Sequence, residues 1–130
     1  MPVPVLILTL ESAEALNLLR ECEERIDLWT VRVVSASAGV ATLRGTSFRL
    51  VIVAPEIPSE EVSALLAGIR RLRHGPPVLA LRSQAPEALS AWQSYRVAIL
   101  CCPLTPGLLS RAVDVALGAS LKIRARPRLN

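Results

Sequence analysis

The side chains that could do chemistry in this chain of 130 residues follow the ends of its apolar runs. They are two carboxylates, a guanidinium and a thiol: Glu11, Glu56, Arg82 and Cys102. A carboxylate can hold a hard cation such as Mg²⁺ or act as a nucleophile, and a guanidinium pairs well with carboxylates. The central run Leu50–Val53, however, is followed by Ala54, so the position where an open α/β sheet usually carries its chemistry has no reactive group.

Arg82 has two interpretations, which the sequence leaves open. Its side chain can fill the space beside Ala54 by pairing with Glu11 or Glu56, because guanidinium groups favour carboxylates. Alternatively, it points into solvent. A single carboxylate beside an alanine does not make a metal site, so the sequence predicts no metal, no cofactor and no catalytic residue.

The cysteines favour a structural interpretation. Cys101 and Cys102 are adjacent and could form a redox pair or a vicinal disulfide, but cysteines at a strand end before a proline are usually small buried hydrophobes. The chain has three cysteines and no CxxC spacing, which argues against a disulfide framework or a zinc site.

His74 follows a group of arginines at the end of a predicted helix: Arg70, Arg71 and Arg73. A cation there complements the helix dipole, and no second ligand accompanies the histidine. We interpret His74 as a helix-end residue and not as a metal ligand or a general base.

Five apolar runs predict the strands that must position these side chains: Val3–Leu8, Trp29–Val34, Leu50–Val53, Val78–Leu81 and Val97–Cys102. Leu50–Val53 has no polar alternation, which is typical of a strand buried on both faces of a parallel sheet. Trp29–Val34 alternates more and predicts an edge strand.

Helical segments alternate with the strands. The first begins after Ser12 and places Ile26 on its buried face, and the third is predicted over Ser59–His74 with Ser59 as its cap. The others are expected within Ser35–Gly45, Ala85–Trp92 and Leu108–Leu121. This order predicts a three-layer α/β sandwich around a five-stranded parallel sheet, with the flavodoxin-like strand order 2-1-3-4-5.

Composition narrows the class of protein further. Hydrophobic residues make up 52 % of the chain and charged residues 20 %, which is typical of a globular domain and not of a disordered chain. No apolar run reaches the length of a membrane span, and the apolar start has no basic flank of a signal peptide, so we expect a cytoplasmic protein. Residues 1–121 are predicted to form one domain and residues 122–130 a mobile basic tail.

The charge is uneven along the chain. Residues 1–65 carry five arginines and nine acidic residues, whereas the remainder carries ten arginine or lysine residues and two acidic ones. A basic second half with a basic tail leaves nucleic-acid binding as a minority hypothesis, because no recognition motif accompanies the charge.

Three segments resemble the receiver domain of bacterial response regulators, at the right spacing and over residues 3 to about 121. RLVIVAPEIP is similar to the family's third strand and its proline loop. SALLAGIRRLRHGPPVLAL is similar to the third helix and fourth strand, and VAILCCPLTPGLLSRAV to the fifth strand and last helix. The resemblance implies a receiver fold.

Family members phosphorylate themselves on an aspartate, with Mg²⁺ held by an acidic pair and with a hydroxyl and a lysine contacting the phosphoryl group. The resemblance places the acidic pair at Thr9 and Leu10, the aspartate at Ala54, the hydroxyl at Arg82 and the lysine at Cys102. None of these types is retained, although the structural prolines Pro58 and Pro103 are. The chain therefore resembles a degenerate receiver, or pseudo-receiver, with a vestigial phosphorylation site.

We expect a non-enzymatic, phosphorylation-independent pseudo-receiver that works in two-component signalling through a protein partner, with a homodimer as the simplest case. The predicted interface joins the segments Ala85–Trp92, Val97–Cys102 and Leu108–Leu121, and its candidate residues are Trp92, Tyr95, Leu108, Arg111 and Val115. Leu108 and Val115 are surplus apolar surface, whereas Trp92 and Tyr95 are either interface anchors or core. The alternative is an atypical receiver regulated by another ligand or acid at the vestigial site.

Overall fold

The computed structural model describes residues 2–83, 92 and 96–125, and for residues 119–125 it describes the backbone alone. The strands are β1 (Val3–Leu8), β2 (Leu28–Val33), β3 (Leu50–Val53), β4 (Val78–Arg82) and β5 (Val97–Cys101). The helices are α1 (Ala13–Glu23), α2 (Ala36–Gly45), α3 (Ser59–Arg70) and α5 (Leu108–Ala125). The helix predicted over Ala85–Trp92 lies outside the described residues except for Trp92, which is helical.

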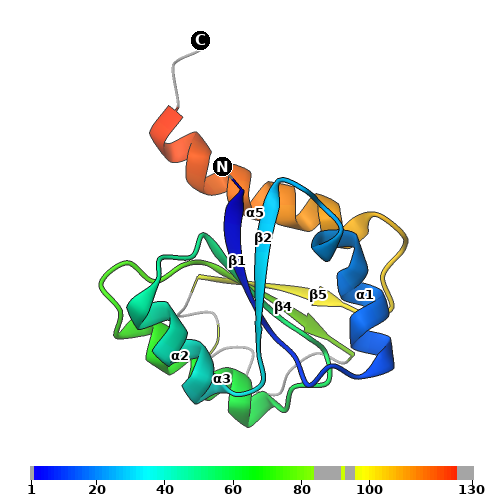
Figure 1. Cartoon of the computed structure of the whole chain (residues 1–130), viewed down its shortest axis with the longest axis horizontal. Helices are drawn as coiled ribbons and strands as arrows, with labels where there is room; N and C mark the ends of the chain where they lie inside the picture. Colours follow the sequence, from blue (N-terminus) through cyan, green and yellow to red (C-terminus); the bar gives the residue numbers. More distant parts are fainter. Residues whose placement is uncertain (1, 84–91, 93–95, 126–130) are drawn as a thin grey trace.

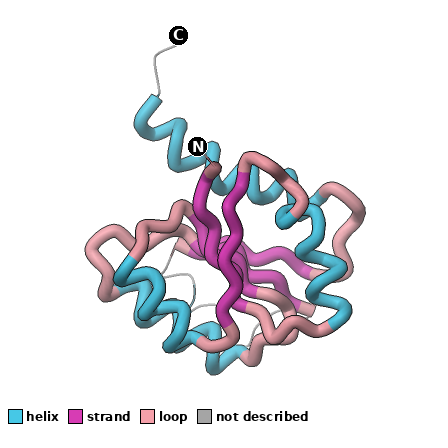
Figure 2. The backbone as a smooth tube through the Cα atoms, viewed as in Figure 1, coloured by secondary structure: helices cyan, strands magenta, loops and turns pink. Residues whose placement is uncertain are grey.

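The five strands form one parallel sheet in the order β2-β1-β3-β4-β5, which confirms the predicted topology. Helices α2 and α3 cover one face of the sheet, and α1 and α5 cover the other (Figure 1). Figure 2 shows the strands enclosed between these two helical layers. The three-layer sandwich follows because β1 and β3 are apolar on both faces and need a cover on each.

Successive residues of β1 belong to two different cores. Leu6 and Leu8 pack on the side of α2 and α3, in what we call the α2/α3-side core, whereas Val5 and Ile7 pack on the side of α1 and α5, in the α1/α5-side core. All four are fully buried. Alternation of side chains across a strand thus explains why the sequence of a central strand shows no polar position.

The starts of two helices test the predicted caps. Ser12 caps α1 as predicted, and its side-chain oxygen accepts a hydrogen bond from the Ala15 N–H at 3.2 Å. The prediction that Ser59 caps α3 is wrong, because the extended residue before this helix is Pro58 and no side chain caps its start. Ser59 is instead the first helical residue, and its hydroxyl accepts a longer contact of 3.4 Å from Arg82 Nη2.

Three helix ends differ from the sequence prediction. Helix α1 ends at Glu23, so Ile26 lies beyond it and is 97 % exposed instead of buried. Helix α3 ends at Arg70, before the predicted His74, and α5 continues to Ala125, past the predicted Leu121. The last turns of α5 extend beyond the body of the domain (Figure 1). Among the described residues, no helix combines the length and apolarity that crossing a bilayer requires.

Glu21 of α1 fixes the start of α5, a contact that sequence reasoning missed. Its carboxylate accepts hydrogen bonds from the Gly107 N–H at 2.8 Å and from the Ser110 N–H at 3.0 Å. Gly107 has a φ of 84°, a left-handed conformation that glycine adopts without steric cost. The carboxylate therefore supplies a cap from another helix, and its charge complements the helix dipole.

We expect Glu21→Ala to lower the free energy of unfolding by about 1–2 kcal/mol, because two N–H groups at the start of α5 lose their acceptor. Chemical denaturation followed by circular dichroism measures the loss. Glu24→Ala, an exposed change just past the end of α1, is the matched control and should change little. Equal effects of the two changes would show that the cap contributes nothing.

The buried thiol of Cys22 is expected to make the folded chain less stable in alkali. Burial raises the pKa of the Cys22 thiol from 9.0 to about 12, and the nearby Arg25 guanidinium opposes part of that increase. Below pH 9.0 the thiol is protonated in both the folded and the unfolded chain, whereas from there to about pH 12 only the unfolded chain ionises. The free energy of unfolding should therefore fall by about 1.4 kcal/mol per pH unit in that window.

Urea denaturation of the wild type and of Cys22→Ala, on both sides of the ordinary thiol pKa, measures this dependence. The substitution costs some packing at every pH, but the gap between the two proteins should narrow as the pH rises. A gap that stays constant through the window would contradict the assignment.

Candidate functional site

Four of the five positions that the sequence analysis assigned to a vestigial phosphorylation site lie at the carboxyl edge of the sheet: Thr9, Ala54, Arg82 and Cys102. The register pairs Leu8 with Val53, and the Ala54 N–H donates to the Leu8 carbonyl oxygen at 2.9 Å. On the far side of β4, the Cys102 N–H donates to the Arg82 carbonyl oxygen at 2.7 Å. The backbone thus places these positions where parallel strands present their chemistry, as the sequence predicted.

Thr9 and Glu56 link the loops that follow β1 and β3. Thr9 is fully buried, and its hydroxyl donates to Glu56 Oε1 at 3.1 Å while accepting the Glu11 N–H at 2.9 Å. The other carboxylate oxygen of Glu56 accepts the Ser12 N–H at 3.1 Å. Both oxygens of Glu56 are therefore used in holding the two loops together, a role that sequence reasoning missed because the partners are far apart in the chain.

The positions after Thr9 turn away from the site. Leu10 is 54 % exposed, so an apolar side chain faces solvent where the resemblance places an acidic one. Glu11 has a φ of 63°, and its carboxylate pairs with Arg32 of β2 at 3.2 Å. Arg32 also pairs with Glu23 at 2.6 Å. Glu11 thus belongs to a surface ion-pair network on the β2 side.

Ala54 is fully buried, and its side chain belongs to the α1/α5-side core. Its neighbour Val53 faces the opposite core. A methyl group here completes the packing under the site and offers neither a nucleophile nor a ligand.

Arg82 adopts neither of its two predicted positions. It is buried, with 8 % exposure, and pairs with neither Glu11 nor Glu56. Its Nη1 donates to the Ile57 carbonyl oxygen at 2.6 Å, and its guanidinium carbon lies 5.8 Å from the centre of the Trp92 ring. The side chain therefore joins β4 to the loop before α3, on the α2/α3 side of the sheet.

Arg82 bears a charge without a carboxylate partner among the residues that the structure describes. Burial lowers its pKa below the ordinary value, and Nε has no hydrogen-bond partner within the described segments. The Trp92 ring and the Ile57 carbonyl compensate part of the cost of desolvating the guanidinium. The contact with Trp92 could not be found from the sequence, because it depends on which face of β4 the arginine takes.

Cys102, where the resemblance places a lysine, is half-buried against the α1/α5-side core. Burial raises the pKa of its thiol, the neighbouring Cys101 raises it further, and the Arg82 guanidinium opposes the increase. The thiol is therefore neutral at physiological pH and supplies no charge to a phosphoryl group. All three cysteines are free thiols, and Cys101 is exposed because it lies on the edge strand, which corrects the prediction of a buried pair.

A groove of about 710 Å³ lies beside the vestigial site, between α1 and the loop that leads into α5. Polar groups from α1 line one side, among them Glu14 and Asn17, and Cys102 and Leu104 line the other. Within the described residues, no group of three or more histidine, cysteine, aspartate or glutamate side chains is placed to hold a metal ion.

The predicted interface residues differ in their environments. Trp92 is 1 % exposed and its Nε1–H donates to the Ser63 hydroxyl at 3.0 Å, so of the two environments that the sequence leaves open for this residue the structure has the core. Tyr95 lies outside the described residues. Leu108 is half-buried, Arg111 is exposed, and Val115 is 71 % exposed on the outer side of α5.

The comparisons with known proteins bear on the fold. No family model matches the sequence, and no curated protein does. Among solved structures, the signal receiver domain of a candidate LuxO repressor protein from Vibrio parahaemolyticus matches with a TM-score of 0.77 at 14 % identity, over 98 % of this chain and 100 % of that one.

Two further structures are similar. The pseudo-receiver domain of the CikA protein matches with a TM-score of 0.62 at 21 % identity, over 98 % of this chain and 100 % of that one. A candidate pilus assembly-related protein from Burkholderia pseudomallei matches with a TM-score of 0.70 at 21 % identity, over 89 % of this chain and 90 % of that one. The fold is that of receiver domains, as the sequence predicted.

Proposed function

We propose that this chain is a phosphorylation-independent pseudo-receiver that acts in signalling, in the cytoplasm, by contact with a protein partner. The observation that carries the proposal is that the side chains of Arg82 and Ala54 both make structural contacts. Arg82 holds the loop before α3 through Ile57, and Ala54 closes the core beneath the site. Because these side chains already make structural contacts, they stabilise one conformation of the domain. That conformation does not need a phosphoryl group to be populated.

Intact-mass spectrometry after incubation with a small-molecule phosphodonor and Mg²⁺ tests this proposal. We expect no added phosphate, because Glu56 is already bonded to Thr9 and Ser12 and the described part of the chain has no group of three or more acidic, histidine or cysteine side chains placed to hold a metal ion. A known phosphorylatable receiver in the same reaction serves as the positive control. A covalent phosphate on this chain would overturn the proposal.

For the partner surface, we propose the face of β5 and α5, with a homodimer as the simplest complex. Leu109, Val113 and Leu117 of α5 are buried against the sheet, which leaves Val115 71 % exposed beside the exposed Arg111. β5 is an edge strand whose residues are only partly covered. An exposed apolar side chain on the helix next to an open edge is the feature that favours contact with a second protein.

Sedimentation at roughly tens of micromolar protein tests the homodimer, because weak interfaces are populated only at such concentrations. We expect a dimer that Val115→Asp dissociates. Ile26→Asp is the matched control, since Ile26 is also exposed but lies after α1. A wild type that stays monomeric would argue against the homodimer and leave a different protein as the partner.

The groove beside Cys102 favours a second candidate function, a receiver regulated by a small ligand. Its volume of about 710 Å³ lies within the range of ligand-binding sites, and carboxylate, amide and thiol groups line it. A screen of small polar compounds for a rise in melting temperature tests this function. A stabilising compound must lose its effect in Leu18→Trp, which fills the groove from α1.

A further inference from the structure

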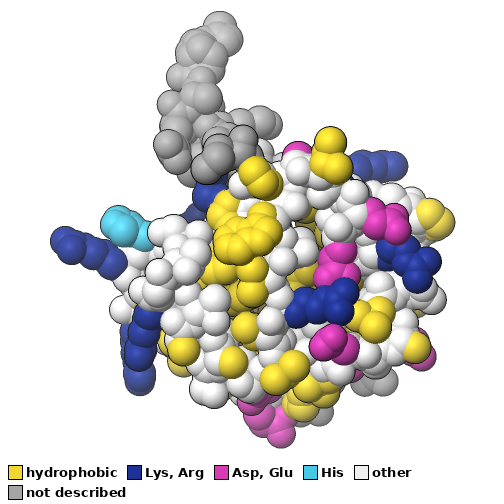
Figure 3. All heavy atoms as spheres, viewed as in Figure 1, with side chains coloured by type: hydrophobic (Ala, Val, Ile, Leu, Met, Phe, Trp, Pro, Cys, Tyr) yellow, Lys and Arg dark blue, Asp and Glu magenta, His cyan; other side chains and the backbone are white. Residues whose placement is uncertain are grey.

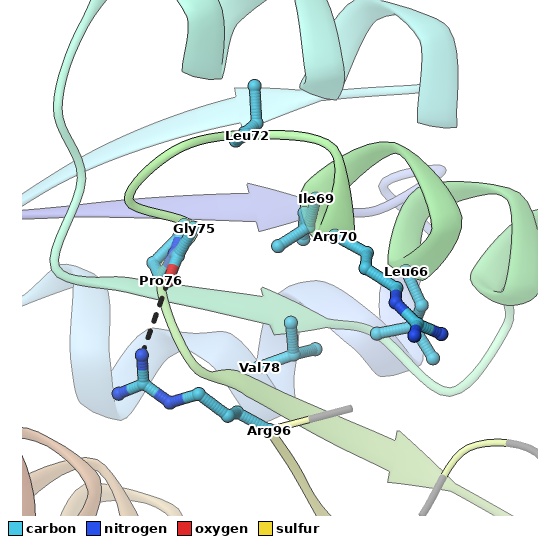
Figure 4. Close-up of a pocket in the computed structure, with 8 residues that line it drawn as sticks. All are labelled: Leu66, Ile69, Arg70, Leu72, Gly75, Pro76, Val78 and Arg96. Carbon is cyan, nitrogen blue, oxygen red and sulfur yellow. Dashed lines mark hydrogen bonds between the residues drawn. The ribbon is translucent and has the colours of Figure 1, made fainter. Parts of the chain in front are cut away.

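A second pocket lies at the opposite, amino edge of the sheet, away from the vestigial site and from the α5 face. It has a volume of about 260 Å³ and is formed by the end of α3, the loop after it and the start of β4 (Figure 4). Apolar side chains form its walls: Leu66, Ile69, Leu72, Pro76 and Val78. Arg70 and Arg96 also line the pocket, and they lie on different sides of these apolar side chains (Figure 4).

The backbone around this pocket is fixed. The Val78 N–H donates to the Arg96 carbonyl oxygen at 2.9 Å, which ties the start of β4 to the residue before β5. A side chain at Gly75 would place its Cβ 2.7 Å from the Ile69 carbonyl oxygen, so only glycine allows the loop to pass this close to α3. The pocket is therefore preformed, which lowers the entropy cost of binding.

The described segments that line the pocket carry basic side chains and no acidic ones. The chain has no acidic residue from 62 to 83 or from 96 to 113, and the first of these stretches carries Arg70, Arg71, Arg73 and His74. The Arg96 guanidinium donates to the Gly75 carbonyl oxygen at 3.4 Å and has no carboxylate partner among the described residues. Figure 3 shows basic side chains and the histidine projecting at one end of the molecule.

The volume of the pocket and the chemistry of its lining indicate which kind of ligand it can bind. A volume of about 260 Å³ is below the range of ordinary ligand sites and suits one apolar side chain of a peptide. Nucleic acid would meet the basic rim, but the lining residues that the structure describes include no aromatic ring on which a base could stack. An acidic peptide satisfies both the apolar walls and the guanidinium groups, which favour carboxylates.

We propose that this pocket binds an acidic segment of a partner protein, with one apolar side chain seated on Ile69 and Val78 and a carboxylate on Arg96. This surface is additional to the β5 and α5 face proposed above. The site is called the amino-edge pocket below.

The test uses fluorescent peptides in which one apolar residue, varied over leucine, isoleucine, valine, methionine and phenylalanine, is flanked by glutamates. Fluorescence anisotropy measures binding to the full chain, and parallel peptides carry glutamine or lysine in place of glutamate. We expect at least one acidic peptide to bind and its neutral and basic counterparts to bind more than about tenfold more weakly.

The variants Arg96→Glu and Arg20→Glu make the same change of charge at different places. Arg20 is exposed on α1, outside the amino-edge pocket. We expect Arg96→Glu to weaken binding of the acidic peptide by about tenfold or more. Arg20→Glu should leave the affinity nearly unchanged. In nuclear magnetic resonance spectra, the amides of Ile69 and Val78 should shift when the peptide is added.

Several outcomes would overturn the inference. They are the failure of every acidic peptide to bind, an equal loss in the two variants, and unchanged binding when the apolar residue is replaced by serine. A DNA duplex that binds more tightly than every acidic peptide, and loses affinity in Arg96→Glu, would assign the surface to nucleic acid instead. The phosphodonor and sedimentation experiments are independent of all these results.

Discussion

Trp92→Ala is expected to lower the free energy of unfolding by about 3–5 kcal/mol, the usual cost of deleting a buried large aromatic side chain. Trp92 is 1 % exposed, packs in the α2/α3-side core, and contacts Arg82 and Ser63. Its removal leaves a cavity and takes away the ring that faces the buried Arg82 charge. Urea denaturation followed by circular dichroism measures the loss.

Two controls separate the parts of this effect. Trp29 stacks on Phe48 with ring centres 6.1 Å apart but is 49 % exposed, so Trp29→Ala should cost well under half as much. Trp92→Phe keeps most of the packing and loses the hydrogen bond to Ser63, which predicts a loss of about 1 kcal/mol. Similar losses for Trp92→Ala and Trp29→Ala would contradict the core assignment of Trp92.

Ala54→Asp should cost about 3 kcal/mol at neutral pH and should not create a phosphorylatable protein. The new carboxylate would enter the α1/α5-side core, while Arg82 is held on the other side of the sheet by Ile57 and Trp92. Thr9, Leu10 and Cys102 would still supply neither the metal ligands nor the cation. Burial should raise the pKa of the introduced carboxyl group above its ordinary value.

The sign of the pH dependence makes this expectation specific. Below the ordinary pKa of aspartate the group is neutral in the folded and unfolded chains, and the penalty is smallest. As the pH rises, the unfolded chain loses the proton first, so the penalty grows. Ala54→Asn is the neutral control and should show a penalty that does not change with pH.

A double-mutant cycle with Arg82→Ala locates the arginine in solution. We expect the losses of Ala54→Asp and Arg82→Ala to add, because the two side chains lie on opposite sides of the sheet. A loss in the double variant much larger than the sum would show that Arg82 moves to the introduced carboxylate. That result would contradict the contact between Arg82 and Trp92 as its stable position.

The sheet could be predicted from the sequence because each strand is marked by a short apolar run of neighbouring residues. Leu50–Val53 is buried on both faces and reads as an unbroken apolar run, and a right-handed β-α repeat leaves few orders for five strands. Helix ends were predicted less well, since Pro58 and not Ser59 occupies the cap position of α3, and this helix ends at Arg70 and not at His74. Ile26 was misplaced because periodicity continues past the point where α1 ends.

The candidate site was predicted in part. Strand ends alone place Thr9, Ala54, Arg82 and Cys102 at one edge, because parallel strands share a direction. The direction of each side chain was not predictable, because it depends on partners far along the chain. Glu56 contacts Thr9, Glu21 contacts Gly107, and Arg82 contacts Trp92, and no local pattern in the sequence marks any of these pairs.

The link between Thr9 and Glu56 also limits which sequences this chain can reach by single changes. Thr9→Asp would set a new carboxylate beside Glu56 Oε1, which now lies 3.1 Å from the threonine hydroxyl, and the two like charges would repel. Ala54→Asp alone would bury an unpaired charge. Each change by itself is therefore expected to lower the stability of the folded chain. An acidic pocket at this edge is thus separated from the present sequence by less stable intermediates, and we expect stable single variants to keep residues 9 and 54 uncharged.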